Sequence, residues 1–429
     1  MFKTLKNAWS IPELRKKLIF TLLVLLLFRL GCAIPVPFIN GDALNNMFNT
    51  QLSGTAFDLM NMMSGSALSS GTLLALGIQP YINASIIIQL LTIAIPALER
   101  MAKEEGEEGK KKINMITRIS TVALGLLMGF GYYQMLVSNN TGATKILETT
   151  NFWTGLVIVL TFTAGSAVVM WLGEQINEYG IGNGISMILF ANIISGIPNT
   201  VVTLAAMFTT PNWWHALIML VGMVLLVLFI VFINDAERRI PIQYAKRVVG
   251  RKVYGGQSTN MPIKVAMSGV MPVIFAQSIC SLPATVCTFI NVGPGNWWYD
   301  NVWSNTSWVY VVVYGLMIFF FSWFYSTIQY DPVEISNNLK KNGGFIPGFR
   351  PGRPTADFIK KVIGKIVIFG AVYLAIVALM PIVSGILLKT AVAMGIGGTS
   401  VIIVVGVALE TVKALEAQML MRHYKGFLD

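Results

Sequence analysis

The sequence predicts an all-α membrane protein with ten transmembrane helices in two inverted five-helix halves, plus a short re-entrant helix. Of its 429 residues, 55% are hydrophobic and only 12% are charged, whereas soluble domains carry about a quarter charged residues. Of the 31 lysines and arginines, 28 lie at the two ends of the chain and in every second gap between long apolar runs. Because basic residues stay on the cytoplasmic side of spanning helices, both termini are predicted to be cytoplasmic, which requires an even number of spans.

Ten apolar runs approach the roughly 20 residues that a spanning helix needs. They cover residues 18–37, 71–97, 116–137, 152–172, 184–206, 213–233, 268–290, 308–328, 362–382 and 397–418. If they divide five plus five, the second half must enter the membrane from the opposite side, as in the inverted repeats of many transport proteins. We therefore expect an N-terminal half at 1–207 and a C-terminal half at 208–429.

A shorter segment at about 55–70, TAFDLMNMMSGSALSS, precedes the second run. Sixteen residues at 1.5 Å each reach only about 24 Å, so this segment cannot cross the hydrocarbon core unaided. It is interpreted as re-entrant, although an amphipathic helix on the external surface is the alternative. In the run that follows, Pro80 stands between Ile78 and Ile82 and is expected to bend the helix.

Ionisable residues are almost absent from the apolar runs, although proton- or sodium-coupled transporters usually place them there. Arg29 lies within the first run and is expected to snorkel or to bind backbone carbonyls. Glu410 and Lys413 are three residues apart in the tenth run, so we expect them to pair on one helix face. A proton relay is therefore disfavoured.

Aliphatic pairs such as Ile78 with Ile82, and Ile185 with Leu189, are four residues apart and share a helix face. By spacing alone, such pairs indicate only core packing or contact with lipid. Uncharged polar residues occur in the second and seventh runs, namely Asn83, Ser85, Gln89, Gln277, Ser278 and Ser281. They predict either structural hydrogen bonds between helices or a weak seam between helices that separate.

Two predicted cytoplasmic loops, at about 234–267 and 329–361, are rich in charge, glycine and proline. This density imposes specific turns, and exposed, shaped loops bind partners. The sequence contains no GxxxxGK[ST] phosphate loop, no HExxH motif and no plausible nucleophile triad. Its three cysteines form no metal-binding pattern. We therefore expect a protein that is not an enzyme, uses no cofactor and takes its energy from a partner.

Several segments together resemble the SecY family, the channel subunits of the bacterial protein translocase. They are ALGIQPYINASIIIQLL (75–91), MWLGEQINEYGIGNGIS (170–186), QYAKR and GGQST in the first loop, NNLKKNGGFIPGFRPG (337–352) and GGTSVIIVVGVALE (397–410). The resemblance covers essentially the whole chain, in order, with all ten spans.

The resemblance implies four sets of functional residues. The matching pore ring is Ile78, Ile82, Ile185, Leu189, Ile274 and Ile403, in which Leu189 departs from the family's preference for isoleucine. The plug helix corresponds to Phe57, Asp58, Met60, Met63 and Leu68. The lateral gate opens between the second and seventh spans, where Asn83, Gln89, Gln277 and Ser281 lie. Docking of a motor or a ribosome is implied for Arg350, with Arg251, Lys252, Lys340 and Lys341 in the same loops.

The resemblance also implies a function. We expect a conduit in the plasma membrane for unfolded secretory polypeptides, which releases hydrophobic segments sideways into the bilayer. The implied partners are SecE, SecG, the SecA motor, the ribosome, signal sequences, unfolded preproteins and membrane lipids, with no recognition of nucleic acid sequence. The alternative is a secondary solute transporter with ten spans and inverted halves.

Overall fold

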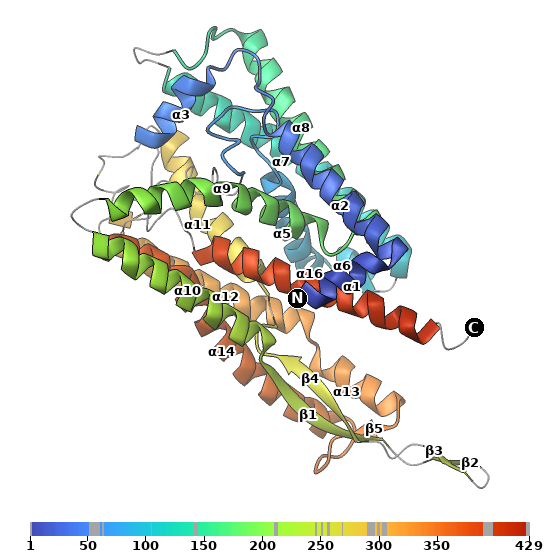
Figure 1. Ribbon diagram of the computed structural model, residues 1–429. Helices are drawn as coiled ribbons and strands as arrows, with labels where there is room; N and C mark the ends of the chain where they lie inside the picture. Colours follow the sequence, from blue (N-terminus) through green and yellow to red (C-terminus); the bar gives the residue numbers. More distant parts are fainter. Residues whose placement is uncertain are drawn as a thin grey trace.

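The computed structural model describes residues 2–50, 61, 64–103, 105–140, 145–209, 213–244, 247–249, 252–254, 258–267, 269–289, 297, 301–302, 307–388 and 398–425. Helices dominate this structure (Figure 1). The helices of the N-terminal part are α1 (Phe2–Ser10), α2 (Pro12–Gly31), α3 (Gly41–Thr50), α5 (Gln79–Ala94), α6 (Pro96–Lys103), α7 (Gly106–Ser138), α8 (Phe152–Tyr179) and α9 (Gly184–Phe208). Those of the C-terminal part are α10 (Trp213–Asp235), α11 (Met271–Phe289), α12 (Trp308–Gln329), α13 (Pro332–Lys341), α14 (Arg353–Leu388) and α16 (Gly398–Lys425).

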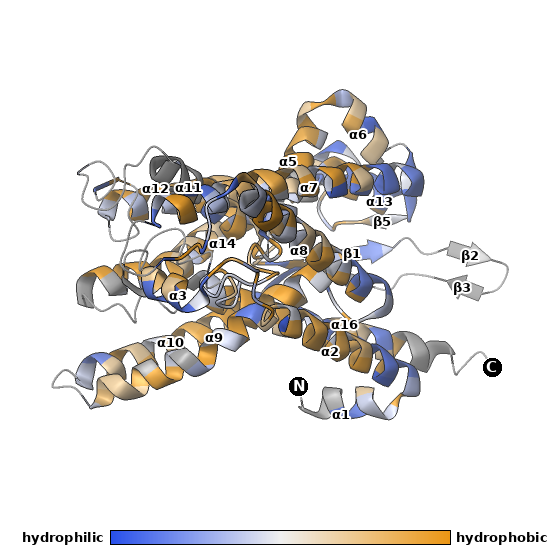
Figure 2. Cartoon of the chain, turned by 90° about the horizontal axis from the view of Figure 1, so that it is seen from above, coloured by the Kyte–Doolittle hydropathy of each residue, from blue (hydrophilic) through white to orange (hydrophobic). Residues whose placement is uncertain are grey.

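Within the described residues, 6 helices are long and apolar enough to cross a membrane, or up to 7 if the bent pair of α5 and α6 forms one span. The other expected spans coincide with α2, α11 and α16. Charged residues lie within α2 and α16, and the apolar part of α11 is short. Figure 2 shows hydrophobic residues along most of the length of the helices, and hydrophilic ones around α13 and β1. This distribution is that of a membrane protein with one polar end.

The second expected span differs from its prediction at both ends. Residues 64–78 form turns, and α5 begins only at Gln79 with Pro80 in its first turn. The expectation that Pro80 bends a continuous helix is therefore wrong. Proline lacks the N–H group that the first helical turn leaves unused, so it begins a helix readily. The bend lies at the other end, where α5 and α6 meet at 106° just before Pro96.

The first large loop contains strands, which the all-α prediction missed. Strand β1 (Glu237–Tyr244) pairs antiparallel with β4 (Ser258–Lys264), and β5 (Gly344–Phe345) from the second large loop pairs with β1. Beyond them, β2 (Arg247–Val249) pairs with β3 (Lys252–Tyr254). In β1, Ile240 and Ile242 are buried whereas Pro241 between them is exposed. This alternation of period two is the pattern of a strand.

The helices from α1 to α9 pack mainly against one another, and those from α10 to α16 do the same. The main contacts between the two groups join α9 to α10 and α16, α1 to α16, and α7 to α11. One of the links in the C-terminal group is an ion pair between Lys413 Nζ on α16 and Asp235 Oδ1 on α10, 2.7 Å apart. The prediction that Lys413 pairs with Glu410 on its own helix is therefore corrected, because Lys413 forms its ion pair with Asp235 on a neighbouring helix.

Candidate pore and its closing segment

The six residues of the predicted pore ring lie in one region of the core. Ile78 is the N-cap residue of α5, and the others come from α5, α9, α11 and α16. Five of them are buried members of the largest hydrophobic cluster, and Ile185 is half-buried and packs against it. These side chains are Ile78, Ile82, Leu189, Ile274 and Ile403. The structure therefore gathers side chains from both groups of helices into a single apolar cluster at the centre of the molecule.

Local sequence fixes the start of α9, where Ile185 and Leu189 lie. The Asn183 side chain accepts hydrogen bonds from the backbone N–H groups of Ile185 and Ser186, which otherwise lack partners at a helix start. Gly184 allows α9 to approach α8 closely, because a Cβ there would lie 1.9 Å from the carbonyl oxygen of Gly173. The GIGNG motif (180–184) thus forms the tight connection between two packed helices.

An irregular segment, residues 64–78, contributes Ala67, Leu74 and Ile78 to the pore cluster. Side chains from three helices donate hydrogen bonds to its carbonyl oxygens. Tyr132 Oη reaches Leu68 O at 2.7 Å, Ser166 Oγ reaches Gly77 O at 3.0 Å, and Arg29 Nη1 reaches Gly65 O at 3.2 Å. The expectation that Arg29 binds a backbone carbonyl is therefore confirmed. Sequence reasoning missed Tyr132 and Ser166, because a lone hydroxyl in an apolar helix carries no positional signal.

Of the predicted plug residues, Leu68 alone falls within the described part of the chain, and Phe57, Asp58, Met60 and Met63 lie outside it. Leu68 is fully buried in a second hydrophobic cluster, together with Tyr132 and Phe162. Its neighbour Ala67 belongs instead to the cluster that holds the pore ring. Residues 67 and 68 thus connect the two clusters.

The predicted gate residues face different neighbours. Asn83 Nδ2 on α5 donates to Met128 Sδ on α7 at 3.8 Å, and Gln89 forms a side-chain hydrogen bond with Tyr325 on α12. Within the described residues, the side-chain carbonyl oxygens of Asn83 and Gln277 are buried without hydrogen-bond partners. Nothing is described of the side chain of Ser281. Helices α5 and α11 thus each carry a buried polar group with unused hydrogen-bonding capacity.

The second large loop has a defined shape around Arg350. Ile346 is buried, and the rings of Phe349 and Phe358 lie 4.3 Å apart between centroids. Gly348 and Gly352 adopt positive φ angles of 88° and 105°, which favour glycine. Two side chains stabilise this backbone conformation by donating hydrogen bonds to its carbonyl oxygens.

These two bonds run from Ser336 Oγ to Gly352 O and from Thr355 Oγ1 to Arg350 O, both at 2.8 Å. The side chains of Arg350, Lys340 and Lys341 are exposed on this frame. Arg251 lies outside the described residues, and Lys252 lies in β3 with no described side chain. Because β5 pairs with β1, the two basic loops are joined in one sheet.

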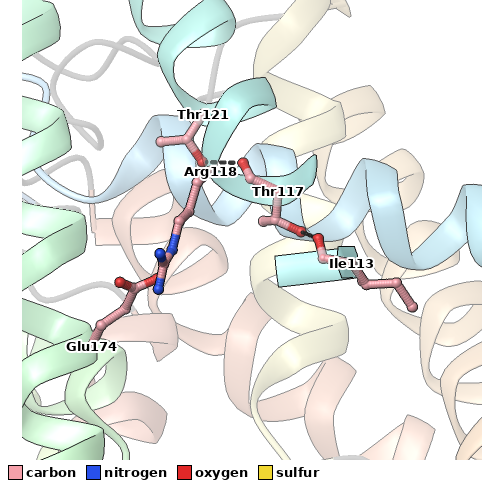
Figure 3. A network of polar contacts seen from close by, with 5 residues as sticks. All are labelled: Ile113, Thr117, Arg118, Thr121 and Glu174. Atoms are coloured by element: carbon pink, nitrogen blue, oxygen red, sulfur yellow. Dashed lines mark hydrogen bonds and ion pairs between the residues drawn. The ribbon is translucent and has the colours of Figure 1, made fainter. Parts of the chain in front are cut away.

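An ion pair connects α7 and α8. Arg118 Nε lies 2.8 Å from Glu174 Oε1, and the hydroxyls of Thr117 and Thr121 bond to carbonyls of their own helix, those of Ile113 and Thr117 (Figure 3). Gly125 and Gly129 let α7 and α8 lie close together further along. The two helices thus form a firm support for α5, which packs on both.

Apolar outer surfaces, a dry central cluster and a polar end with shaped loops define a multispanning helical membrane protein of the channel or transporter class. Among the described residues, no group of three or more His, Cys, Asp or Glu side chains could hold a metal ion. The SecY family model matches residues 72–412. The chain belongs to the SecY family.

Individual relatives and structures agree with this assignment. The chain is 42% identical to the protein translocase subunit SecY of Streptomyces scabiei and 40% identical to that of Bacillus subtilis, in each case over 100% of both chains. Its fold is similar to a solved structure described as a protein conducting channel, with a TM-score of 0.68 and 19% identity, covering 94% of this chain and 92% of the other. It is also similar to Sec61 in a canine ribosome-channel complex, with a TM-score of 0.63 and 17% identity over 94% and 92% of the two chains.

Proposed function

We propose that this protein is a protein-conducting channel that moves unfolded secretory polypeptides across the plasma membrane and releases hydrophobic segments sideways into the bilayer. The observation that carries the proposal is that five of the six aliphatic side chains, from helices of both groups, belong to one hydrophobic cluster and that the sixth, Ile185, packs against it. A narrow apolar ring excludes water when it is empty and so stops ions. It also adapts to many side chains, because it makes no specific polar contact with them.

The proposed layout is ten spans in two inverted halves, 1–207 and 208–429, with both termini in the cytoplasm. Each group of helices packs chiefly within itself, which supports two halves that move relative to each other. The terminal helices α1 and α16 pack together, which supports placing both ends on one side. In this layout, the segment at about 55–70 is the plug that closes the external side of the ring.

The proposed lateral gate lies between α5 and α11. Helix α11 packs chiefly against α12 of its own group, with smaller contacts to α14 and to α7 of the other group. Buried carbonyl oxygens of Asn83 and Gln277 without partners make this seam weaker than a fully bonded one. A hydrophobic segment inside the pore would therefore leave through this side at modest cost.

The exposed basic residues Arg350, Lys340 and Lys341, with Arg251 and Lys252, are proposed to dock the cytoplasmic partner that supplies energy, SecA or a ribosome. A related structure, Sec61, is described in a ribosome-channel complex. SecE and SecG are proposed as companion subunits. The family assignment does not support the alternative function, that of a secondary solute transporter. The apolar runs also contain almost none of the mid-membrane acidic residues that such a transporter would use for coupling.

Site-specific photo-crosslinking tests the proposal. A stalled secretory chain should crosslink to probes placed at Ile82, Ile185 and Ile274, and the crosslinks should depend on SecA. Phe232 on α10 is a matched control, because its side chain is 72% exposed on the outer surface. Crosslinking at Phe232 with none at the three pore positions would refute the assignment of the pore.

A further inference from the structure

Arg29 is a charged residue placed where charge is costly. It lies in the last turn of α2, within the first predicted span. Ionisable groups inside membrane spans are expensive and usually serve a function. Its guanidinium donates a hydrogen bond from Nη1 to the carbonyl oxygen of Gly65, 36 residues along the chain. Arg29 thus links the first spanning helix to the segment that precedes α5.

The backbone at Gly65 is enclosed by polar side chains from two helices. A Cβ added there would lie 2.7 Å from Arg29 Nη1, 2.8 Å from Ser195 Oγ and 3.1 Å from Asn192 Oδ1. Gly65 also has a φ angle of +66°, which glycine adopts without strain. We name this group of four residues, Arg29, Gly65, Asn192 and Ser195, the Gly65 contact. It places the backbone of Gly65 between α2 and α9.

Movement of Gly65 would carry its neighbours along as one unit. Asn61 O accepts hydrogen bonds from Ser64 Oγ and from the Ser66 backbone N–H, both at 2.9 Å. Asn61 Oδ1 accepts another from the Ser69 backbone N–H at 2.8 Å. Asn61 and residues 64–69 are therefore joined by hydrogen bonds among themselves that involve none of the surrounding helices. Together they form the turn at the C-terminal base of the proposed plug segment.

We propose that Arg29 is a positioning residue for the closed state: its bond to Gly65 fastens the base of the plug segment to α2 and sets how readily that segment leaves its place. The inference rests on the proposed channel function. The guanidinium suits this task because a charged donor binds a carbonyl more strongly than a neutral one does. Here a single charged side chain bonds to a single carbonyl oxygen of the segment.

The direct test measures access to the turn itself. Ala67 is buried and forms no side-chain hydrogen bond, so Ala67→Cys is a small change that reports on the turn. In a background with Cys32, Cys280 and Cys287 replaced by serine, a water-soluble maleimide would be applied to the protein in proteoliposomes. Arg29→Met should raise the labelling rate of Ala67→Cys about tenfold, as loss of a charge-assisted bond implies.

Two further variants keep the test decisive. Arg29→Gln should also raise the labelling rate of Ala67→Cys, because it removes the charge even though it keeps an N–H donor. Both variants should insert well, because they remove a charge from a span. Arg118→Met is the matched control, since it breaks an ion pair between α7 and α8 and leaves residues 61–78 untouched. If Arg29→Met or Arg29→Gln labels at the same rate as Arg118→Met, the proposed role of Arg29 is refuted.

A separate export assay measures whether Arg29 affects the opening of the channel. With Arg29→Met, a precursor with an intact signal sequence should still be exported, and a precursor with a weakened signal should be exported several times faster than by the parent. If Arg29→Met leaves the labelling rate of Ala67→Cys at the parental value and a stalled precursor still crosslinks at Ile82, the role of Arg29 is refuted and the channel function stands. Raised labelling with no crosslinking at Ile82 would instead overturn the channel function.

Discussion

Replacement of Gly165 by alanine should displace the irregular segment from α8. Gly165 lies where α8 passes closest to that segment. A Cβ at this position would lie 2.0 Å from Leu73 O and 3.0 Å from Leu73 C, whereas ordinary van der Waals contact begins at 3.4 Å. Both of these atoms belong to the backbone, so no side-chain rotation relieves the overlap. The helix and the segment must move apart by about 1.4 Å.

The expected cost follows from three contributions. Overpacking a well-packed core costs about 1–3 kcal/mol. The same movement breaks the buried bond from Ser166 Oγ to Gly77 O, now 3.0 Å long, and an unsatisfied buried group costs about 1–3 kcal/mol. Alanine is a better helix former than glycine by about 0.8–1 kcal/mol, which offsets part of the loss. We expect Gly165→Ala to lower the free energy of unfolding by about 3 kcal/mol.

Thermal unfolding in detergent would measure this change. The free, buried thiols of Cys32 and Cys280 react with a maleimide dye only when the structure opens, so they serve as internal reporters. Gly222→Ala on α10 is the matched control, because a Cβ there would meet no atom within 4 Å. An unfolding midpoint for Gly165→Ala equal to that of Gly222→Ala would show that the close approach of α8 to Leu73 does not exist in the protein.

Two further substitutions separate docking from packing. Arg350→Glu should leave insertion and thermal stability unchanged, because Thr355 bonds to the Arg350 backbone, and should weaken SecA-driven export in membrane vesicles; unchanged export would remove Arg350 from the docking surface. Tyr132→Phe should lower the free energy of unfolding by about 1–2 kcal/mol, because it leaves the buried carbonyl of Leu68 without this donor; the same thiol-reactivity assay would measure it, and a midpoint equal to that of the parent would contradict the bond.

The sequence predicted the helices well because apolar length and charge placement act over whole spans. It failed for residues 71–78, which an apolar run of 71–97 made appear helical, and for residues 64–70 of the expected re-entrant helix, which form turns. That segment is irregular because donors from distant helices, such as Tyr132 and Ser166, satisfy its carbonyls. Such tertiary bonds leave no local pattern. Pro80 carried the correct signal of a boundary, but it marked the start of a helix and not a bend within one.

The charged contacts show the same limit. Local spacing favoured a bond between Lys413 and Glu410, whereas the fold brings Asp235 from another helix to Lys413. Likewise, Ile240 and Ile242 alternate as in a strand, but Pro241 between them and the surrounding basic residues hid the pattern. The pore ring was assigned through family resemblance, because its helices are brought together only by the fold and aliphatic spacing is common to all spanning helices.

Non-helical backbone at membrane depth is tolerated only where protein or a water-filled cavity satisfies its polar groups. In residues 64–78, single side chains on α2, α7 and α8 bond to the carbonyls of Gly65, Leu68 and Gly77. A helix packed in the same place would keep its internal hydrogen bonds both in the closed pore and after leaving it. Its release would therefore depend on side-chain packing alone. Backbone bonds from Val36 N to Gly71 O and from Leu73 N to Ile34 O also hold this segment, but the three side-chain bonds can be weakened one at a time, and each can be changed without altering the helices that form the ring.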